Sequence, residues 1–146
     1  MFRGRYEHSV DDKGRLSIPS RFREILARRR QRMLILTDVD SCVAAYPLDE
    51  WRQLEDRIRK QSTLQKDVRA FLRIFYSGAT ESPMDGQGRI LIPPHLRERT
   101  GLTREVMIIG VLNKMEIWSK ARWEEFLARS PVTFEDVAAR LADLGI

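Results

Sequence analysis

Short segments in which apolar and polar residues alternate, or in which apolar residues run together, recur along the whole chain. Alternation is typical of a half-buried β-strand, and a short apolar run is typical of a strand buried on both faces. Proline cannot donate to a strand ladder, so Pro19 and Pro93 mark the ends of two of these strands. The strands predicted in this way cover residues 15–19, 33–38, 42–46, 89–93, 106–111 and 115–118.

Other segments place apolar residues three and four positions apart, which predicts amphipathic helices. One begins after Pro47, a second ends before Gly78, a third lies between Ser119 and Pro131, and a last one has Thr133 as its N-cap. We expect their apolar stripes to pack in the core, and a subunit interface is the alternative for some of them. The stripes consist of Leu48, Trp51, Leu54, Ile58, Leu64, Val68, Phe71, Leu72, Phe75, Trp123, Phe126, Leu127, Val137 and Leu141.

The chain also contains an internal repeat. Residues 11–24 read DDKGRLSIPSRFRE and residues 85–98 read DGQGRILIPPHLRE, and seven of these fourteen positions are identical. Average composition would give about one identity by chance. Since half of the chain is too short to bury much core alone, we expect the two copies to form one domain with a pseudo-twofold axis.

Together, the strands, the helices and the repeat predict a mainly β fold with flanking helices, in the α+β class. The turn that opens each repeat has a hairpin sequence, because Asp and Gly tolerate a positive φ. We expect a first half over residues 1–55, a connecting helical segment over 56–78, a second half over 79–130 and a C-terminal helix over 131–146.

Positive charge is concentrated near the N-terminus. The whole chain has 26 Lys and Arg against 21 Asp and Glu, a net charge of +5. Residues 1–32 alone hold ten basic and four acidic side chains, so this segment carries +6 and the rest of the chain −1. Such a local excess is typical of a surface that faces a polyanion such as nucleic acid. A solvated cluster that only improves solubility is the alternative.

No residue pattern points to an enzyme. His8 and His95 lack partners at metal-ligand spacing, and Cys42 lies in an apolar strand, where we expect it to be buried. A single cysteine excludes an intrachain disulfide and favours the reducing cytoplasm. No apolar run approaches the roughly 18 residues of a membrane span, and the N-terminus lacks the apolar segment of a secretory signal. We therefore expect no catalysis, metal, cofactor, small-molecule ligand or membrane.

The repeated pattern Asp-x-x-Gly-Arg-[Leu/Ile]-x-Ile-Pro resembles the swapped-hairpin DNA-binding proteins of the AbrB superfamily. The tandem arrangement, the start Met-Phe-Arg-Gly and the segment RAFLRIFYSGA at residues 69–79 are similar to the MraZ family in particular. The resemblance covers essentially the whole chain. It implies a double-split, swapped-hairpin β-barrel built from two SpoVT-AbrB-like halves, with helices outside and the subunits assembled into a ring. It also implies a bacterial transcriptional regulator that is associated with the nucleoid and acts on the promoter of the division and cell-wall gene cluster.

The resemblance identifies Asp11 with Arg15, and Asp85 with Arg89, as the Asp-x-x-x-Arg pairs of the two copies. An arginine beside a tight turn holds its guanidinium in one place, where it can contact phosphate or pair bidentately with guanine. The aspartate and arginine of one turn can instead pair with each other and only stabilise the hairpin. We expect Arg15 to contact DNA because its neighbours are basic, whereas structural pairing is favoured for Arg89.

The predicted functional residues form two sets. The DNA-contacting residues carry positive charge in or near the hairpins, and they are Arg3, Arg5, Lys13, Arg15, Arg21, Arg23 and Arg89. The hairpin-organising residues supply the turn geometry, and they are Asp11, Gly14, Asp85 and Gly88.

The predicted function is sequence-specific regulation of transcription, with repression as the expected sign. A homo-oligomeric ring would bind direct repeats in double-stranded promoter DNA, so that several modest contacts add up by avidity. One alternative is an RNA-binding regulator, for which only Phe2, Tyr6 and Phe22 lie near the basic cluster to stack on bases. The other alternative is an oligomeric scaffold that binds an acidic protein partner.

Overall fold

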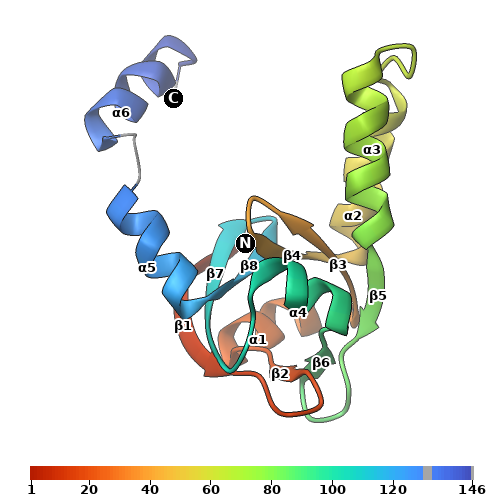
Figure 1. Cartoon of the computed structure of the whole chain (residues 1–146), viewed down its shortest axis with the longest axis vertical. Coiled ribbons are helices and arrows are strands. Elements are labelled where there is room, and N and C mark those ends of the chain that lie inside the picture. Colours follow the sequence, from red (N-terminus) through yellow and green to blue (C-terminus); the bar gives the residue numbers. More distant parts are fainter. Residues whose placement is uncertain (130–132, 146) are drawn as a thin grey trace.

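The computed structural model describes residues 1–129 and 133–145 of the chain. The strands are β1 (Phe2–Ser9), β2 (Arg15–Ser17), β3 (Met33–Val39), β4 (Cys42–Pro47), β5 (Thr80–Pro83), β6 (Arg89–Leu91), β7 (Glu105–Leu112) and β8 (Lys114–Ser119). The helices are α1 (Ser20–Arg28), α2 (Leu48–Arg59), α3 (Lys66–Gly78), α4 (Pro94–Thr100), α5 (Lys120–Arg129) and α6 (Phe134–Asp143). The strands form a six-stranded sheet in the order β1-β7-β8-β4-β3-β5 and a separate two-stranded ribbon of β2 and β6 (Figure 1).

Strands from the two copies of the repeat pair with each other, and all of these pairs are antiparallel. β1 pairs with β7 along its whole length, β4 pairs with β8, and β2 pairs with β6. In each case one strand comes from the first copy and its partner from the second. The two copies therefore share one sheet, and they are interleaved rather than placed side by side.

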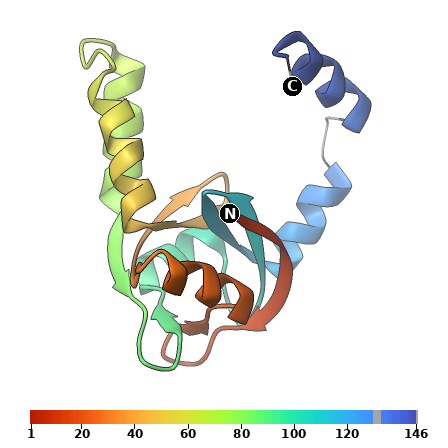
Figure 2. The same cartoon turned by 180° about the vertical axis from the view of Figure 1, so that it is seen from behind.

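Two hydrophobic clusters stabilise this arrangement. The larger one draws on both copies, with Leu16 and Leu34 from the first and Ile90 and Ile108 from the second, all fully buried. The smaller cluster contains the stacked rings of Trp51 and Phe75, through which α2 and α3 pack on the sheet. Figure 2 shows α1 and α4 near the ribbon, and α2 with α3 at one side of the sheet.

The α+β class is confirmed, and all six predicted strands are present as β2, β3, β4, β6, β7 and β8. Strand β1 was not predicted, because only Phe2 of its eight residues is buried and Arg3, Arg5 and Glu7 face solvent. An edge strand with one polar face and few buried side chains lacks the apolar alternation by which strands are recognised.

A closed β-barrel, which the family resemblance implies, is not formed by the described residues. β1 and β5 are the two edges of the six-stranded sheet, and the β2–β6 ribbon joins neither edge by a strand ladder, apart from one isolated bridge between Val10 and Leu16. Pro19 and Pro93 follow shortly after the two ribbon strands, which have three residues each. Since proline cannot donate a backbone hydrogen bond, the ribbon cannot extend far enough to close the sheet.

The expectation that the helical stripes are core is correct only in part. Trp51 and Phe75 are buried, but the outer residues of the stripes are exposed: Leu64, Phe71, Phe126, Leu127, Val137 and Leu141. Leu64 lies in the turn before α3 rather than in a helix, and Val137 and Leu141 lie on α6. The other exposed residues lie on helices that stand out from the sheet, α3 with α2 from one side and α5 from the opposite side (Figures 1 and 2). The outward faces of these helices have no partner in the described part of this chain. For their residues the alternative interpretation, a subunit interface, therefore stays open.

The helix boundaries agree with the capping signals. The Thr133 hydroxyl accepts a hydrogen bond of 3.2 Å from the Asp136 backbone N–H, as expected for an N-cap. The predicted helix end near Pro131, and part of the predicted C-terminal segment 131–146, lie outside the described residues. Within the described ranges, no helix combines the length and the apolar character that crossing a bilayer requires.

Candidate nucleic-acid interface

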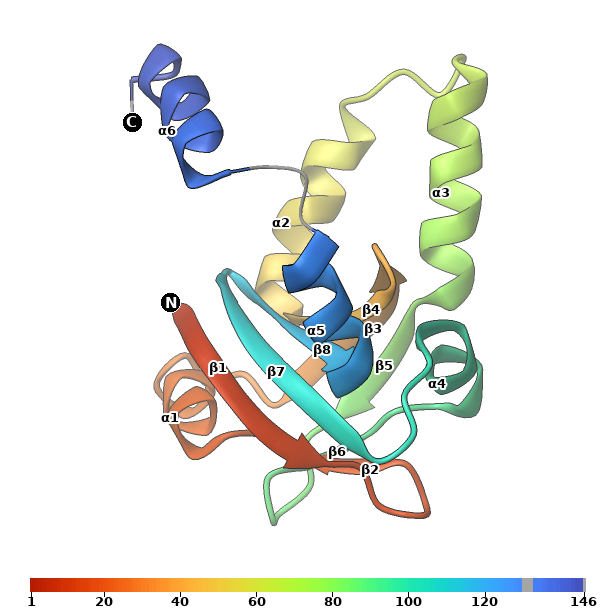
Figure 3. The ribbon, with the colours of Figure 1, turned by 60° about the vertical axis from the view of Figure 1, so that its left-hand side comes forward.

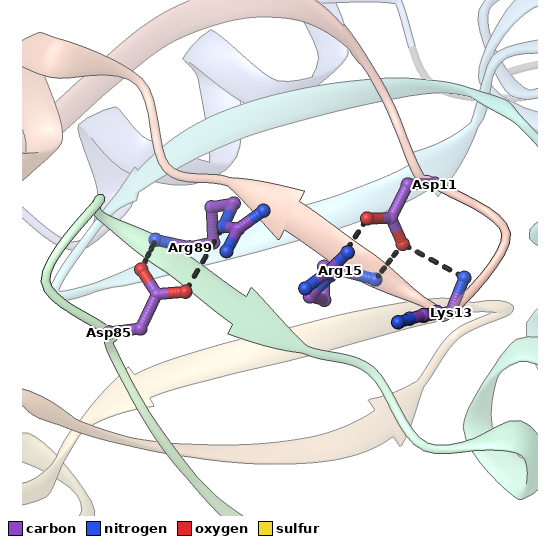
Figure 4. A network of polar contacts seen from close by, with 5 residues as sticks. All are labelled: Asp11, Lys13, Arg15, Asp85 and Arg89. Atoms are coloured by element: carbon purple, nitrogen blue, oxygen red, sulfur yellow. Dashed lines mark hydrogen bonds and ion pairs between the residues drawn. The ribbon is translucent and has the colours of Figure 1, made fainter.

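The β2–β6 ribbon separates apolar from charged side chains. Leu16 lies opposite Ile90 at its centre, and both side chains point into the core. Side chains alternate between the two faces of a strand, so the neighbouring Arg15 and Arg89 point away from the core. Because the pairing is antiparallel about this central pair, the two arginines come to lie on the same outward face (Figure 4).

The first hairpin is organised by the carboxylate of Asp11. Its Oδ1 accepts hydrogen bonds from the backbone N–H of Lys13 (3.0 Å) and of Arg15 (2.9 Å). Its Oδ2 accepts from Arg15 Nε at 2.8 Å. Gly14 completes the turn with φ +86°, a value that non-glycine residues rarely adopt, and its N–H donates to the Asp11 carbonyl at 3.0 Å.

The second hairpin repeats this geometry. Asp85 Oδ1 accepts from the backbone N–H of Gln87 and of Arg89, both at 2.9 Å. Asp85 Oδ2 accepts from Arg89 Nε at 3.1 Å, and Gly88 has φ +77°. From the sequence we expected DNA contact for Arg15 and structural pairing for Arg89. The two aspartate–arginine pairs nevertheless have the same geometry, so the geometry does not distinguish the two arginines.

In both pairs only the Nε edge of the guanidinium is used within the hairpin. The side chains of Arg15 and Arg89 are 36% and 29% exposed. Within the described ranges, the terminal Nη1 and Nη2 of these arginines make no hydrogen bond to the chain. Pairing with aspartate and contact with a ligand are thus compatible, because they occupy different edges of the same planar group.

The hairpins favour the ionised form of their aspartates. The pKa of Asp11 is lowered, mainly by the hydrogen bond from the Arg15 backbone N–H, with the Arg15 side chain adding to the effect. The pKa of Asp85 is lowered in the same way, mainly by the backbone N–H of Arg89. A carboxylate that accepts several N–H groups holds its negative charge more readily, so both turns keep their charge to lower pH.

The fold distributes the other predicted basic residues over separate places. Arg3 and Arg21 line a groove of about 660 Å³ between β1 and α1. Figure 3 shows that β1 starts at the end of the sheet far from the hairpins, and the six steps from Arg3 to Ser9 span about 20 Å. Arg5 is exposed on the same strand, whereas Arg23 on α1 lies against the second hairpin. The seven predicted residues therefore do not form one compact cluster.

Comparison with known proteins agrees with the repeat. The sequence profile of the MraZ protein family matches the chain twice, over residues 1–74 and 75–145. A protein named Transcriptional regulator MraZ from Acetivibrio thermocellus is 47% identical over 146 residues, and one of the same name from Alkaliphilus metalliredigens is 46% identical. Another, from Moorella thermoacetica, is 44% identical. Each of these alignments covers 100% of this chain and 100% of the relative.

The chain belongs to the MraZ family. Its relatives in that family are named transcriptional regulators, which is not a class of enzyme. The two matches of the MraZ profile each contain one Asp-x-x-x-Arg hairpin of this chain.

Neither a metal-binding group nor a reactive thiol is present in the described part of this chain. That part contains no group of three or more His, Cys, Asp and Glu side chains arranged to hold a metal ion. Cys42 is buried, as expected, and its Sγ lies 3.1 Å from the Val39 carbonyl. Burial raises the pKa of this thiol strongly, which removes the thiolate that a nucleophile requires.

Three arginines outside the predicted set of DNA-contacting residues lie near the hairpins. Arg30 and Arg32 line a groove of about 480 Å³ beside the second hairpin, together with Arg23. Arg97 packs against Gly14 in the first hairpin. The repeat itself could have indicated Arg97, because it occupies the position in the second copy that Arg23 occupies in the first.

Proposed function

We propose that this chain is a sequence-specific DNA-binding regulator of transcription, and that the outward face of the β2–β6 ribbon docks on double-stranded promoter DNA. The observation that carries the proposal is the placement of Arg15 and Arg89 on one face, each with its terminal Nη groups available. A two-stranded β-ribbon fits the major groove, and a fixed guanidinium can pair with guanine O6 and N7 or with phosphate.

In this proposal some residues fix the geometry of the turns and others supply positive charge. Asp11, Gly14, Asp85 and Gly88 hold the turns, so that the arginines pay little conformational entropy on binding. Lys13 adds a positive charge at the tip of the first hairpin. Arg3, Arg5, Arg21 and Arg23 contribute phosphate contacts at the sides, and the release of counterions from these contacts supplies sequence-independent affinity.

We further propose that the chain assembles into a homo-oligomeric ring that presents several ribbons to direct repeats in the promoter of the division and cell-wall gene cluster, and represses it in the cytoplasm at the nucleoid. The exposed apolar side chains of α3 and α5, such as Phe71, Ile74 and Leu127, support an assembly of this kind. The pairing of β2 with β6 across the repeat supports a swapped-hairpin origin for each ribbon.

The test is a gel shift on the promoter upstream of the chain's own gene, over a series of salt concentrations. We expect Arg15→Ala and Arg89→Ala each to weaken binding by about 1–3 kcal/mol and to reduce discrimination against unrelated DNA. Arg52→Ala is the matched control, because it removes the same charge from an exposed position on α2. Binding by both hairpin variants that equals that of the wild type would contradict the proposal.

Duplex DNA is favoured over RNA by the position of the aromatic rings. Phe2 and Phe22 are each only 1% exposed, and Tyr6 packs edge-on against Phe22 with 5.1 Å between ring centroids. Two of the three rings are therefore covered and Tyr6 is half-buried, which leaves little ring surface on which unstacked bases could stack. The same gel shift, repeated with single-stranded RNA, separates the two functions, and a scaffold that binds an acidic protein would show little affinity for either nucleic acid at low salt.

A further inference from the structure

Each hairpin glycine is covered by an arginine from the other copy of the repeat. A Cβ atom placed on Gly14 would lie 2.9 Å from both Nε and Cζ of Arg97, closer than side chains approach in proteins. In the reciprocal position, a Cβ on Gly88 would lie 2.9 Å from Nη1 of Arg23 and would also meet its Cδ. The lack of a side chain at each turn therefore makes room for a guanidinium that crosses from the opposite copy.

Backbone hydrogen bonds run across the repeat at the same two places. The Ile92 N–H donates to the Gly14 carbonyl at 2.8 Å, and the Ile18 N–H donates to the Gly88 carbonyl at 2.9 Å. Each turn is thus tied to the residue that directly follows the ribbon strand of the other copy. The arginine and this backbone bond therefore meet at the same glycine of the turn.

Arg97 makes one contact that Arg23 lacks. Its Nε donates to the Ile92 carbonyl at 2.9 Å, and no corresponding bond from Arg23 to the Ile18 carbonyl occurs in the described residues. Arg97 is also half-buried, whereas Arg23 is exposed. Arg97 therefore connects the end of β6 to the first turn, and it does so without an ion pair to a carboxylate in the described part of the chain.

From these contacts we infer that Arg97 is a positioning residue for the first hairpin, and that Arg23 has the same role for the second hairpin. Arg97 fixes the Gly14 peptide against the ribbon, and the Asp11–Arg15 pair on the other side of that turn is held in place as a result. The functional consequence rests on the proposed function, since only a hairpin that contacts DNA needs its guanidinium positioned. The additional hydrogen bond to the Ile92 carbonyl anchors the Arg97 side chain itself, an anchor that Arg23 lacks in the described residues.

Peptide-resolved hydrogen exchange of the full-length protein tests this assignment by a crossed pattern. We expect Arg97→Ala to make the amides of residues 11–15 exchange about fivefold faster, the factor that corresponds to one lost hydrogen bond, without a comparable change at residues 85–89. Arg23→Ala should accelerate residues 85–89 and not residues 11–15. Exchange in β4 and β8 reports whether each variant remains folded.

Two further variants sharpen the test. Arg97→Lys keeps the aliphatic stem and the charge, and it should restore part of the protection at residues 11–15, which is the expected rescue for a side chain that packs on the turn. Arg99→Ala is the control on the same helix, because Arg99 pairs with Asp38 at 2.9 Å and not with the hairpin. We expect this control to leave exchange at both hairpins unchanged.

The outcomes separate the two proposals. A variant that loosens only the hairpin of its own copy, or both hairpins equally, overturns the positioning role. The crossed pattern together with about fivefold weaker promoter binding by Arg97→Ala supports both proposals. The crossed pattern with unchanged binding by Arg97→Ala, Arg15→Ala and Arg89→Ala supports the positioning role and contradicts the proposed function.

Discussion

At the scale of single residues, the guanidiniums of Arg15 and Arg89 divide their hydrogen-bonding capacity between two tasks. The Nε edge binds the aspartate four positions earlier, at 2.8 Å in the first hairpin and 3.1 Å in the second. The Nη edge makes no hydrogen bond to the described residues and stays available for a ligand. An arginine can do this because its five N–H groups lie in one plane and point along different edges of it, whereas a lysine cannot orient one donor and present another in a fixed direction.

The lowered pKa values of Asp11 and Asp85 lead to a prediction about acid stability. A carboxyl whose pKa is lower in the folded state stabilises that state above its unfolded pKa of about 3.9, and loses this contribution as the pH falls through the lowered folded pKa. We therefore expect the free energy of unfolding of the double variant Asp11→Asn, Asp85→Asn to fall less steeply below pH about 4 than that of the wild type. Urea unfolding at a series of pH values measures this.

The control for this experiment is Asp12→Asn. Asp12 lies in the same exposed turn, and its carboxylate accepts no hydrogen bond from the described residues. It should retain the acid dependence of the wild type. A double variant with the same acid dependence as the wild type would show that the two carboxylates do not stabilise the hairpins.

At the scale of elements, the glycines of the two hairpins differ in importance. Gly14 has φ +86° and faces Arg97 and the Ile92 carbonyl, whereas a Cβ on Gly86 would meet nothing within 4 Å. We expect Gly14→Ala to destabilise the protein by about 1–3 kcal/mol, from the strained backbone and the displaced arginine. Gly86→Ala should change stability by less than about 0.5 kcal/mol, as an open surface position does. Urea denaturation midpoints compare the two, and equal losses would argue against a cross-repeat contact at Gly14.

The same elements show how far the sequence predicts the fold and the site. The doubled turn, the strands that carry Leu16 and Ile90, and the family could all be read from spacing and residue type. The contact between Arg97 and Gly14 could not be predicted from the sequence. It depends on how the two copies interleave, and 83 positions separate these residues. Strand β1 was also not predicted, since an edge strand with one buried residue has no periodic pattern of apolar residues.

At the scale of the whole molecule, the exposed apolar surfaces of the helices favour association. Ile74 on α3 is 58% exposed, and with Phe71 it forms part of an apolar face that stands away from the sheet. Exposed apolar surface of this kind is typical of protein interfaces. We expect Ile74→Glu to shift the protein toward smaller species in analytical ultracentrifugation, because a buried carboxylate at an interface is costly.

Arg73→Ala serves as the neighbouring control, since Arg73 is exposed on the same helix and makes no ion pair within the described residues. It should leave the sedimentation profile unchanged. If Ile74→Glu sediments as the wild type does, α3 is not part of the interface, and the association would have to use another surface.

The interleaved strand order has a consequence for synthesis on the ribosome. The central strand β4 needs β8, and β1 needs β7, so the amino-terminal half emerges with its sheet edges unsatisfied. These edges stay open until about residue 119, the end of β8, has left the exit tunnel. Open edges recruit other strands and proteases. A transcript or ribosome that stops midway therefore yields no half-active regulator, only a fragment for degradation.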